Sequence, residues 1–138
     1  MTAIQAHDFF EGYVQAFVHN DIDGICARWG YPALLAFDGR QLALDADAFR
    51  RNAVRLCAFY AAQGMAHAEK EIIELVRLTE ATAAVRTKDR LYDAAGALIV
   101  QWEHAYLMST TPAGIKISAA LPDGERRAWQ DRGTPLSI

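Results

Sequence analysis

The sequence has few cysteines, no excess of basic residues and no long apolar run, and each shortage excludes a class of protein. Its 138 residues include two cysteines, Cys26 and Cys57, which are too few for a disulfide framework. The 14 basic and 17 acidic residues give a net charge of −3, whereas nucleic-acid-binding domains usually carry a basic stripe. No run approaches the roughly 18 apolar residues of a membrane span. We therefore expect neither nucleic acid nor a membrane as a partner.

Signals for export, metals and nucleotide cofactors are also missing. Residues 1–20 include His7, Asp8 and Glu11 and lack the basic head of a signal peptide, so we expect a cytoplasmic protein with reduced cysteines. The four histidines and two cysteines do not have the spacing of zinc ligands, and no glycine-rich nucleotide-binding loop occurs. We predict no metal and no cofactor.

The residues that are present predict one folded domain with a helical first half. The apolar fraction of 52% is high enough for a hydrophobic core. Thr2 and Gln5 have capping-box spacing and predict a helix from about residue 3. A short second helix follows Asp21, and a third lies between Asp45 and Gly64. The pair at 38–39, Asp-Gly, stands between two apolar runs and predicts a hairpin.

From residue 65 onward the apolar period changes to two, which predicts strands. We expect them at about 66–78, 82–92, 97–109 and 114–121, in an antiparallel meander. Helices gathered on one side of an antiparallel sheet make an α+β fold. We expect a single domain over residues 1–121 and a polar C-terminal arm, extended or frayed, over 122–138.

This order of elements resembles the NTF2-like (SnoaL-like, cystatin-like cone) superfamily over about residues 3–121. The resemblance rests on these segments: Trp29-Gly30-Tyr31-Pro32, Asp38-Gly39 before a helix, Arg90-Leu91-Tyr92-Asp93 with Gly96, and Trp102 to Leu107 followed by Gly114-Ile115-Lys116-Ile117. It implies three N-terminal helices packed on a strongly curved antiparallel sheet, a cone. Enzymes of this superfamily, such as ketosteroid isomerase and scytalone dehydratase, work inside the cone, and many use a carboxylate or a histidine without metal. Many other members are ligand-binding or dimerisation modules.

The register of the sheet predicts which side chains meet inside. If residues 93–96 form a four-residue loop, Val85 lies opposite His104, Thr87 opposite Trp102, and Asp89 opposite Val100. One face then carries Thr87, Asp89, Trp102, His104 and Tyr106. Extending this register to the last strand predicts that Ile115, Ile117, Ala119 and Leu121 also face inward. The other face mixes charges with Ile99 and Leu107, and it is either a homodimer surface or a solvated face.

Two polar residues on the inner face are candidates for acid–base chemistry, because charged groups rarely go inside without a partner. Asp89 and His104 lie roughly 13 Å apart along the strands in this register, so they could line one pocket from its two ends. Each also has an ordinary alternative, Asp89 as a rim carboxylate and His104 as a packed core histidine. A three-residue loop at 79–81 puts Glu71 opposite Asp89, and a two-residue loop puts Lys70 there instead. We favour Glu71, since this register also turns Ile73 and Leu75 inward.

The sequence therefore predicts a dimeric module that binds a hydrophobic small molecule. The alternative is a cofactor-independent isomerase, dehydratase or hydrolase with Asp89 or His104 as acid or base. The expected ligand-binding residues are Tyr13, Trp29, Tyr31, Phe37, Glu71, Thr87, Trp102 and Tyr106. Of these, the resemblance implies that Trp29, Tyr31 and Phe37 lie near the mouth of the cone and that Tyr13 matches the position of the isomerase tyrosine.

Overall fold

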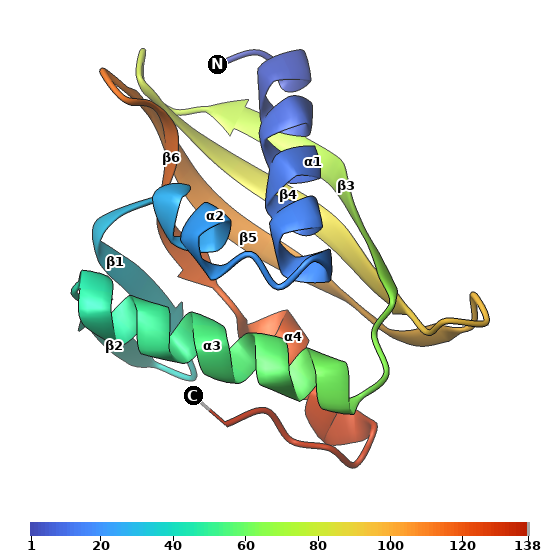
Figure 1. Ribbon diagram of the computed structural model, residues 1–138. Helices are drawn as coiled ribbons and strands as arrows, with labels where there is room; N and C mark the ends of the chain where they lie inside the picture. The colour runs from blue at the N-terminus through green and yellow to red at the C-terminus, as the bar shows by residue number, and fades with distance from the viewer. Residues whose placement is uncertain (138) are drawn as a thin grey trace.

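The computed structural model describes residues 1–137 and contains four helices and six strands in that range (Figure 1). The helices are α1 (Ala3–Val18), α2 (Ile22–Ala27), α3 (Ala46–Ala62) and α4 (Asp123–Asp131). The strands are β1 (Trp29–Phe37), β2 (Arg40–Leu44), β3 (His67–Arg77), β4 (Thr82–Tyr92), β5 (Leu98–Thr111) and β6 (Gly114–Leu121).

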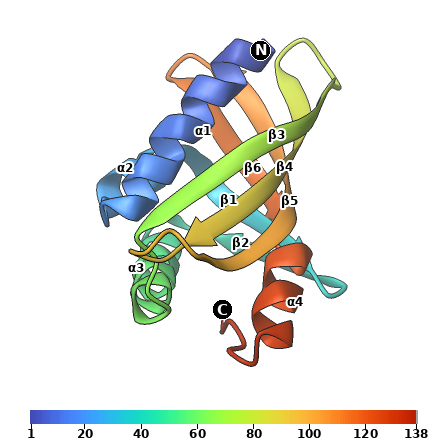
Figure 2. The ribbon, with the colours of Figure 1, turned by 90° about the vertical axis from the view of Figure 1, so that its right-hand side faces the viewer.

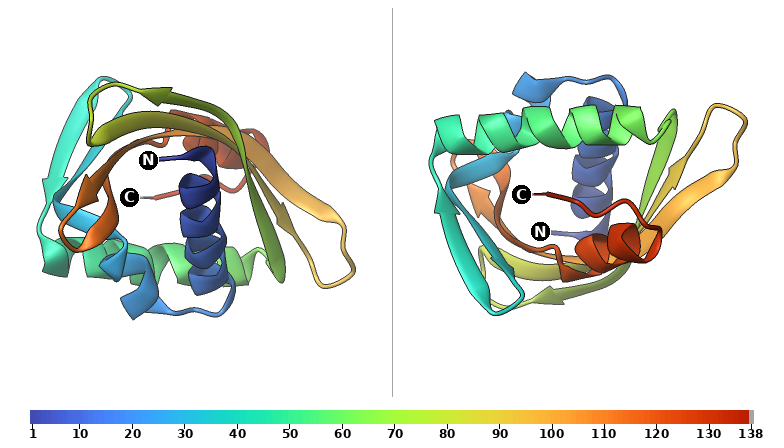
Figure 3. Two further views of the ribbon diagram at one scale, coloured as in Figure 1. Left: turned by 90° about the horizontal axis from the view of Figure 1, so that it is seen from above. Right: turned by 90° about the horizontal axis from the view of Figure 1, so that it is seen from below.

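The strands form one curved sheet in the order β2-β1-β6-β5-β4-β3, antiparallel except where β1 runs parallel to β6. The long strands bend around α1 (Figure 2), and α3 lies across the lower part of the molecule (Figure 1). Seen end-on, the sheet curls around one side of the interior, and α1 and α3 close the other side (Figure 3). The predicted α+β architecture, with helices on a strongly curved sheet, is confirmed.

Local sequence signals account for the ends of several elements. The Thr2 hydroxyl accepts from the Gln5 N–H at 3.1 Å, and the Gln5 side chain accepts from the Thr2 N–H at 2.9 Å, so the predicted capping box is present. The Asp45 carboxylate accepts from the Ala48 N–H at 2.8 Å and caps α3. Asp38 and Gly39 have φ angles of 51° and 70°, the left-handed values that a tight hairpin turn between β1 and β2 needs.

The expectation of an extended arm after residue 121 was wrong, because residues 123–131 form α4. β6 ends at Leu121, where it pairs with Ala105, and α4 then packs against the earlier part of β5. A Cβ atom at Gly124 would lie 2.3 Å from the carbonyl oxygen of Glu103, so the helix fits there because position 124 has no side chain. Trp129 is completely buried, and Leu136 is 9% exposed. The segment after α4 runs across the lower opening of the cone (Figure 3).

The predicted register between β4 and β5 was wrong by two residues, although the two faces of the strands are as predicted. Val85 pairs with Tyr106, Thr87 with His104, and Asp89 with Trp102. One residue of the difference comes from the hairpin, which pairs Tyr92 with Leu98, and the other comes from an irregularity between Leu91 and Tyr92. A shift of two residues leaves each side chain on its face, because side chains alternate along a strand.

Bulges also overturn two expectations on the neighbouring strands. Near the β3–β4 turn, Glu74 pairs with Arg86, but Ile73 is an extra residue in β3 and is 42% exposed rather than inward. Beyond it, Lys70 and not Glu71 lies opposite Asp89.

A register shift within the β5–β6 pair changes which β6 residues face inward. Ile117 is buried as predicted, but Ala120 is the next buried residue in place of Ala119, and Leu121 is 47% exposed. A bulge shifts pairing by one residue, which exchanges the faces of every residue beyond it.

Candidate functional site

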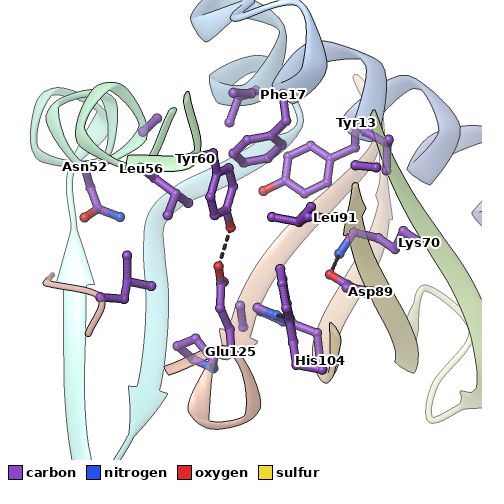
Figure 4. Close-up of a pocket in the computed structure, with 18 of the residues that line it drawn as sticks. Tyr13, Phe17, Asn52, Leu56, Tyr60, Lys70, Asp89, Leu91, His104 and Glu125 are labelled. Carbon is purple, nitrogen blue, oxygen red and sulfur yellow. Dashed lines mark hydrogen bonds and ion pairs between the residues drawn. The ribbon is translucent and has the colours of Figure 1, made fainter. Parts of the chain in front are cut away.

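The interior of the cone holds a cavity of about 110 Å³. This volume has room for several water molecules or a small organic molecule. Its walls come from the concave face of the sheet and from α1, α3 and α4 (Figure 4). Apolar and aromatic side chains make up most of the lining, and Leu136 and Ser137 of the C-terminal segment contribute to it. Such a lining with a few polar groups is typical of small-molecule sites.

β5 provides one wall of the cavity, because its alternate residues Trp102, His104 and Tyr106 share the concave face. Their exposed fractions are 6%, 7% and 6%. The His104 and Tyr106 rings stack with centroids 4.6 Å apart and planes 14° apart. The indole N–H of Trp102 donates to Nδ1 of His104 at 3.0 Å. This wall is therefore rigid, and one ring nitrogen of His104 is already occupied.

His104 is held in its neutral form. Burial and, to a smaller extent, the nearby Lys70 ammonium lower the pKa of the imidazole to about 3, against a smaller opposite effect of Asp89. Because Nδ1 accepts a hydrogen bond, Nε2 carries the proton. His104 can thus donate one hydrogen bond, but its geometry and low pKa do not favour it as a base.

The sheet carries a polar group of four residues, the Lys70–Asp89 cluster, which also includes Thr87 and Tyr106. The Lys70 ammonium is ion-paired with Oδ2 of Asp89, and their side chains are 8% and 6% exposed. The Thr87 hydroxyl donates to Oδ1 of Asp89 at 2.6 Å, and the ammonium also donates to the Tyr106 hydroxyl at 2.7 Å. Both carboxylate oxygens of Asp89 are therefore taken, and the charge is balanced.

A second polar group, the Glu125 cluster, joins α4 to α3 across the cavity and consists of Glu125, Tyr60 and Trp129. Glu125 is 4% exposed. The Tyr60 hydroxyl donates to Oε2 of Glu125, and the Trp129 indole donates to the same oxygen at 3.2 Å (Figure 4). Among residues 1–137, no group donates to the other oxygen, Oε1, and no cation pairs with the carboxylate.

Burial without a counter-ion raises the pKa of the Glu125 carboxyl to about 7, although the hydrogen bonds from Tyr60 and Trp129 act in the opposite direction. At neutral pH the group is therefore divided between its acid and carboxylate forms. A titratable group poised near neutrality inside a cavity is a candidate for ligand binding or proton transfer.

Six of the ten residues that the sequence singled out line the cavity: Tyr13, Trp29, Asp89, Trp102, His104 and Tyr106. Tyr13 and Trp29 are joined by a hydrogen bond of 2.9 Å from the indole to the phenol oxygen. Asp89 and His104 lie on adjacent strands, with Thr87 rather than Val85 opposite His104, so they stand closer than the predicted register allowed.

The other four predicted residues do not line the cavity. Tyr31 is 39% exposed and donates to the Cys26 carbonyl at 2.7 Å. Phe37 is buried beneath the Arg126 guanidinium, whose carbon is 4.5 Å from the ring centroid. Glu71 lies on the outside of the sheet and pairs with Arg90 at 3.3 Å. Thr87 is buried behind Asp89 and reaches the site only through that carboxylate.

Sequence reasoning missed Glu125 and Tyr60, and it ranked Lys70 second to Glu71. A signal for α4 was available, since Asp123 and Glu125 are acidic residues where a helix after Pro122 would begin. The i, i+4 spacing of Glu125 and Trp129 also places both on one helix face. The position of Lys70 opposite Asp89 depends on a bulge in β3, and no residue type in that segment predicts a bulge.

The described part of the chain shows neither a metal site nor a membrane-spanning helix. Within residues 1–137, no three His, Cys, Asp or Glu side chains are grouped so that they could hold a metal ion. No helix in that range is long and apolar enough to cross a membrane.

Comparison with known proteins places this cone in a family. Residues 4–125 match the model of the family described as "NTF2-like protein (DUF6841)". The chain belongs to this NTF2-like family. No curated protein matches the chain.

Solved structures of the NTF2-like fold agree with the architecture. An NTF2-like protein of unknown function from Shewanella oneidensis has a TM-score of 0.68 at 14% identity, over 88% of this chain and 98% of its own. A cystatin-like domain from Nostoc punctiforme has a TM-score of 0.67 at 15% identity, over 88% and 77%. A ketosteroid isomerase-like protein from Erwinia carotovora has a TM-score of 0.62 at 18% identity, over 88% and 95%. At such identities the likeness concerns the fold.

Proposed function

We propose that this NTF2-like protein binds a small, largely apolar molecule inside the cone. The observation that carries the proposal is a cavity of about 110 Å³ lined mainly by apolar side chains, with buried polar groups facing it. Protein interiors are usually packed without voids larger than a water molecule, so a space of this size is a feature that a ligand would fill. Its burial would be driven by the hydrophobic effect.

Two unused hydrogen-bonding positions support a ligand with polar atoms. His104 has a proton on Nε2 for which residues 1–137 offer no acceptor, and Oε1 of Glu125 has no donor in the same range. Neither atom is among the fully buried side-chain atoms that lack a partner, so both can be reached from the cavity by water or by the polar atoms of a ligand. A ligand with an acceptor at one end and a donor at the other would complete both.

Filling the cavity with a side chain tests this proposal. Ala53 of α3 lines the cavity and is 3% exposed, whereas its neighbour Val54 is 50% exposed on the outside of the same helix. Benzyl alcohol, followed by NMR chemical shifts, is the probe. We expect saturable shifts around the cavity in the wild type and in the control Val54→Leu, and much weaker binding in Ala53→Leu. Equal binding by Ala53→Leu, or no binding by the wild type, would contradict the proposal.

A second candidate is cofactor-independent acid–base catalysis, such as isomerisation, dehydration or hydrolysis, with Glu125 as the proton-transferring group. The pKa of about 7 supports this role, because a carboxyl poised near neutrality can both give and accept a proton. Asp89 and His104, the residues expected from the sequence, are less suited. Asp89 is held by Lys70 and Thr87, and His104 has a low pKa and an occupied Nδ1.

Proton transfer to and from carbon gives a test of this second candidate. The protein is incubated with small cyclic ketones in deuterated water, and deuterium incorporation next to the carbonyl is followed by NMR. The hypothesis predicts incorporation above the buffer rate, with a pH midpoint near 7, and its loss in Glu125→Gln. Incorporation that persists in Glu125→Gln would assign the chemistry to another residue.

We also propose that the outer face of the sheet supports a homodimer. Leu107 is 39% exposed there, beside an ion-pair network in which Arg86 contacts Glu74 at 3.2 Å and Glu103 at 2.6 Å. Charge reversal with Glu103→Lys would set two cations side by side and weaken such a surface. Size-exclusion chromatography should then show a later elution volume than the wild type, and an unchanged volume would count against the dimer.

A reducing, cytoplasmic location remains part of the proposal. Cys26 and Cys57 are free and buried, and burial raises the pKa of the Cys57 thiol to about 11. Buried thiols that stay protonated behave as small apolar side chains and suit a compartment without disulfide formation. Fractionation of the native host cells, followed by detection of the protein in the cytosolic fraction, tests this expectation.

A further inference from the structure

We propose that the ligand of the cone is an apolar amine whose ammonium group binds Oε1 of Glu125, with its apolar part against the aromatic walls of the cavity. The inference rests on the proposed function, since it names the chemical class of the molecule that the cavity takes. Three features of the site support it: a free carboxylate oxygen, the balance of buried charge, and the rings that line the cavity.

The first feature is the position of the carboxylate. Glu125 is 4% exposed, and it lines the cavity from the first turn of α4. Both protein donors, Tyr60 and Trp129, reach the same oxygen, Oε2. Oε1 is therefore the acceptor that a bound molecule can use without displacing a protein contact, and a carboxylate oxygen forms its strongest hydrogen bonds with a cationic donor.

The second feature is the charge of the groups around the cavity. The titratable groups that face the cavity with Glu125 are Tyr13 from α1, Tyr60 from α3, Lys70 from β3, Asp89 from β4, and His104 and Tyr106 from β5. Burial raises the pKa of the three tyrosines and lowers that of the histidine, so these four groups are neutral. Lys70 and Asp89 cancel one another. Glu69 also borders the cavity, but it is exposed to solvent.

Glu125 is consequently the buried charge that no described residue balances when it is ionised. An ammonium group would neutralise it, whereas a carboxylate or phosphate ligand would place a second negative charge beside it. A buried charge is tolerated when it is paired and hydrogen-bonded. The charge balance therefore favours a cation over a neutral or anionic ligand.

The third feature is the aromatic lining around this end of the cavity. The rings of Phe17, Tyr60 and Trp102 line it. The Phe17 and Tyr60 centroids are 5.9 Å apart, and Trp102 lies 6.4 Å from the Trp129 ring that bonds Glu125. Aromatic faces attract cations, and rings combined with a carboxylate are a common way to hold an amine. The same rings provide apolar area for the rest of the molecule.

Isothermal titration calorimetry with benzylamine and benzyl alcohol separates this inference from the proposed function, because the two probes differ in one polar group. Benzylamine is a cation at both pH 6 and pH 8. With the pKa of Glu125 at about 7, the carboxylate fraction and hence the amine affinity should be about tenfold higher at pH 8 than at pH 6. At pH 8 we expect the amine to bind on the order of tenfold more tightly than the alcohol, or better.

Variants assign the preference to Glu125. Glu125→Gln keeps an acceptor for Tyr60 and Trp129 but carries no charge, so it should show no preference for the amine over the alcohol at either pH value. Its fold is checked by NMR before titration. Glu69→Gln, at the exposed rim, is the matched control and should keep the preference for the amine.

Two results would overturn the inference while leaving the proposed function in place. These are equal affinities of the wild type for amine and alcohol, and a preference for the amine that survives in Glu125→Gln. If neither probe binds the wild type at any concentration tested, the proposed function fails and the inference fails with it.

Discussion

The two buried carboxylates of the cone, Asp89 and Glu125, differ in their partners and not in their burial. Each residue is 4% exposed. Asp89 receives an ammonium and a hydroxyl on separate oxygens, whereas Glu125 receives two neutral donors on one oxygen. The pKa of Glu125 rises to about 7 because burial acts on a charge that lacks a counter-ion. The partners of a buried carboxylate, more than its degree of burial, therefore determine whether it remains available to a ligand.

The structural origins of the two clusters differ in the same way. The Lys70–Asp89 cluster is formed across two neighbouring strands, β3 and β4, and belongs to the sheet. The Glu125 cluster depends on α4, which joins the fold by packing against β5 after β6 has ended. We therefore interpret the first cluster as structural and the second as the polar end of the binding site.

Replacing Lys70 by Met should have the largest effect, because it converts the paired cluster into an unpaired one. Asp89 would be left as a buried charge without a cation, and breaking a buried pair costs about 3–5 kcal/mol. The free energy of unfolding in urea at pH 7 measures the loss. The double variant Lys70→Met, Asp89→Asn, which has neither charge, should recover much of it. If Lys70→Met lowers the free energy of unfolding no more than the loss of an exposed ion pair does, the buried pair does not stabilise the fold.

Glu125→Gln removes the unpaired charge and should stabilise the protein at alkaline pH. The carboxyl pKa of Glu125 is about 7 in the folded chain and 4.5 in the unfolded reference, a difference of about 2.5 units. The folded state thus binds more protons between these values, and this residue lowers stability as the pH rises from 4.5 to 7. At 1.36 kcal/mol per unit, the variant should gain up to about 3 kcal/mol at pH 8 and almost nothing below pH 4.5.

The difference between variant and wild type is the quantity to measure in this case. His104 has a lowered pKa of about 3, so its own contribution rises with pH from 3 to 6.5 and opposes that of Glu125 in the wild-type profile. Subtracting the profiles removes the histidine. If Glu125→Gln were less stable than the wild type at pH 8, the carboxylate would have to be favourably paired in the fold.

Tyr60→Phe should have a smaller effect in the same cluster. The Tyr60 hydroxyl donates to Glu125 and lowers the pKa of the carboxyl, so its removal should move that pKa further above 7. A hydrogen bond to a charged group is worth about 2 kcal/mol, and this should be lost at pH 8, where the carboxylate predominates. Urea denaturation at pH 5 and pH 8 checks the difference. Equal losses at both pH values would point to packing of the ring rather than to the charge.

Arg86→Ala is the matched surface control and should have the smallest effect. Arg86 contacts Glu74 and Glu103 on the outer face, and all three side chains are about half exposed, at 49%, 50% and 53%. Exposed ion pairs contribute little because water and salt screen them. At a protein concentration low enough for the chain to be monomeric, the urea midpoint should be close to that of the wild type, in contrast to Lys70→Met. A loss comparable to that of Lys70→Met would remove the distinction between buried and surface pairs.

Much of the fold follows from periodicity and from local signals in the sequence. Thr2 and Asp45 cap their helices, the pair at 38–39 turns the first hairpin, and a period of two identifies the long strands. The same period placed Trp102, His104 and Tyr106 on one face, and this was right even though the register was wrong by two residues. The prediction of which side chains share a face does not change with a register shift of two residues, because side chains alternate along a strand with a period of two.

The candidate site was less predictable because it depends on features with weak local signals. One extra residue in β3, Ile73, decides whether Lys70 or Glu71 meets Asp89. The segment after Pro122 is mostly polar and charged, and this composition predicts an exposed arm even though the segment contains one tryptophan, Trp129. A buried face made of one tryptophan and one glutamate is visible only once the neighbouring α3 and β5 are in place.

The central claim, that Glu125 is a buried carboxyl without a counter-ion, is tested most directly by titrating that one group. Carbon-13 NMR of the side-chain carboxyl, assigned by comparison with Glu125→Gln, follows its ionisation in the unliganded protein. We expect a midpoint near pH 7. A midpoint near the ordinary value of 4.5 would contradict it, because the carboxylate would then be stabilised in the fold as well as it is in water.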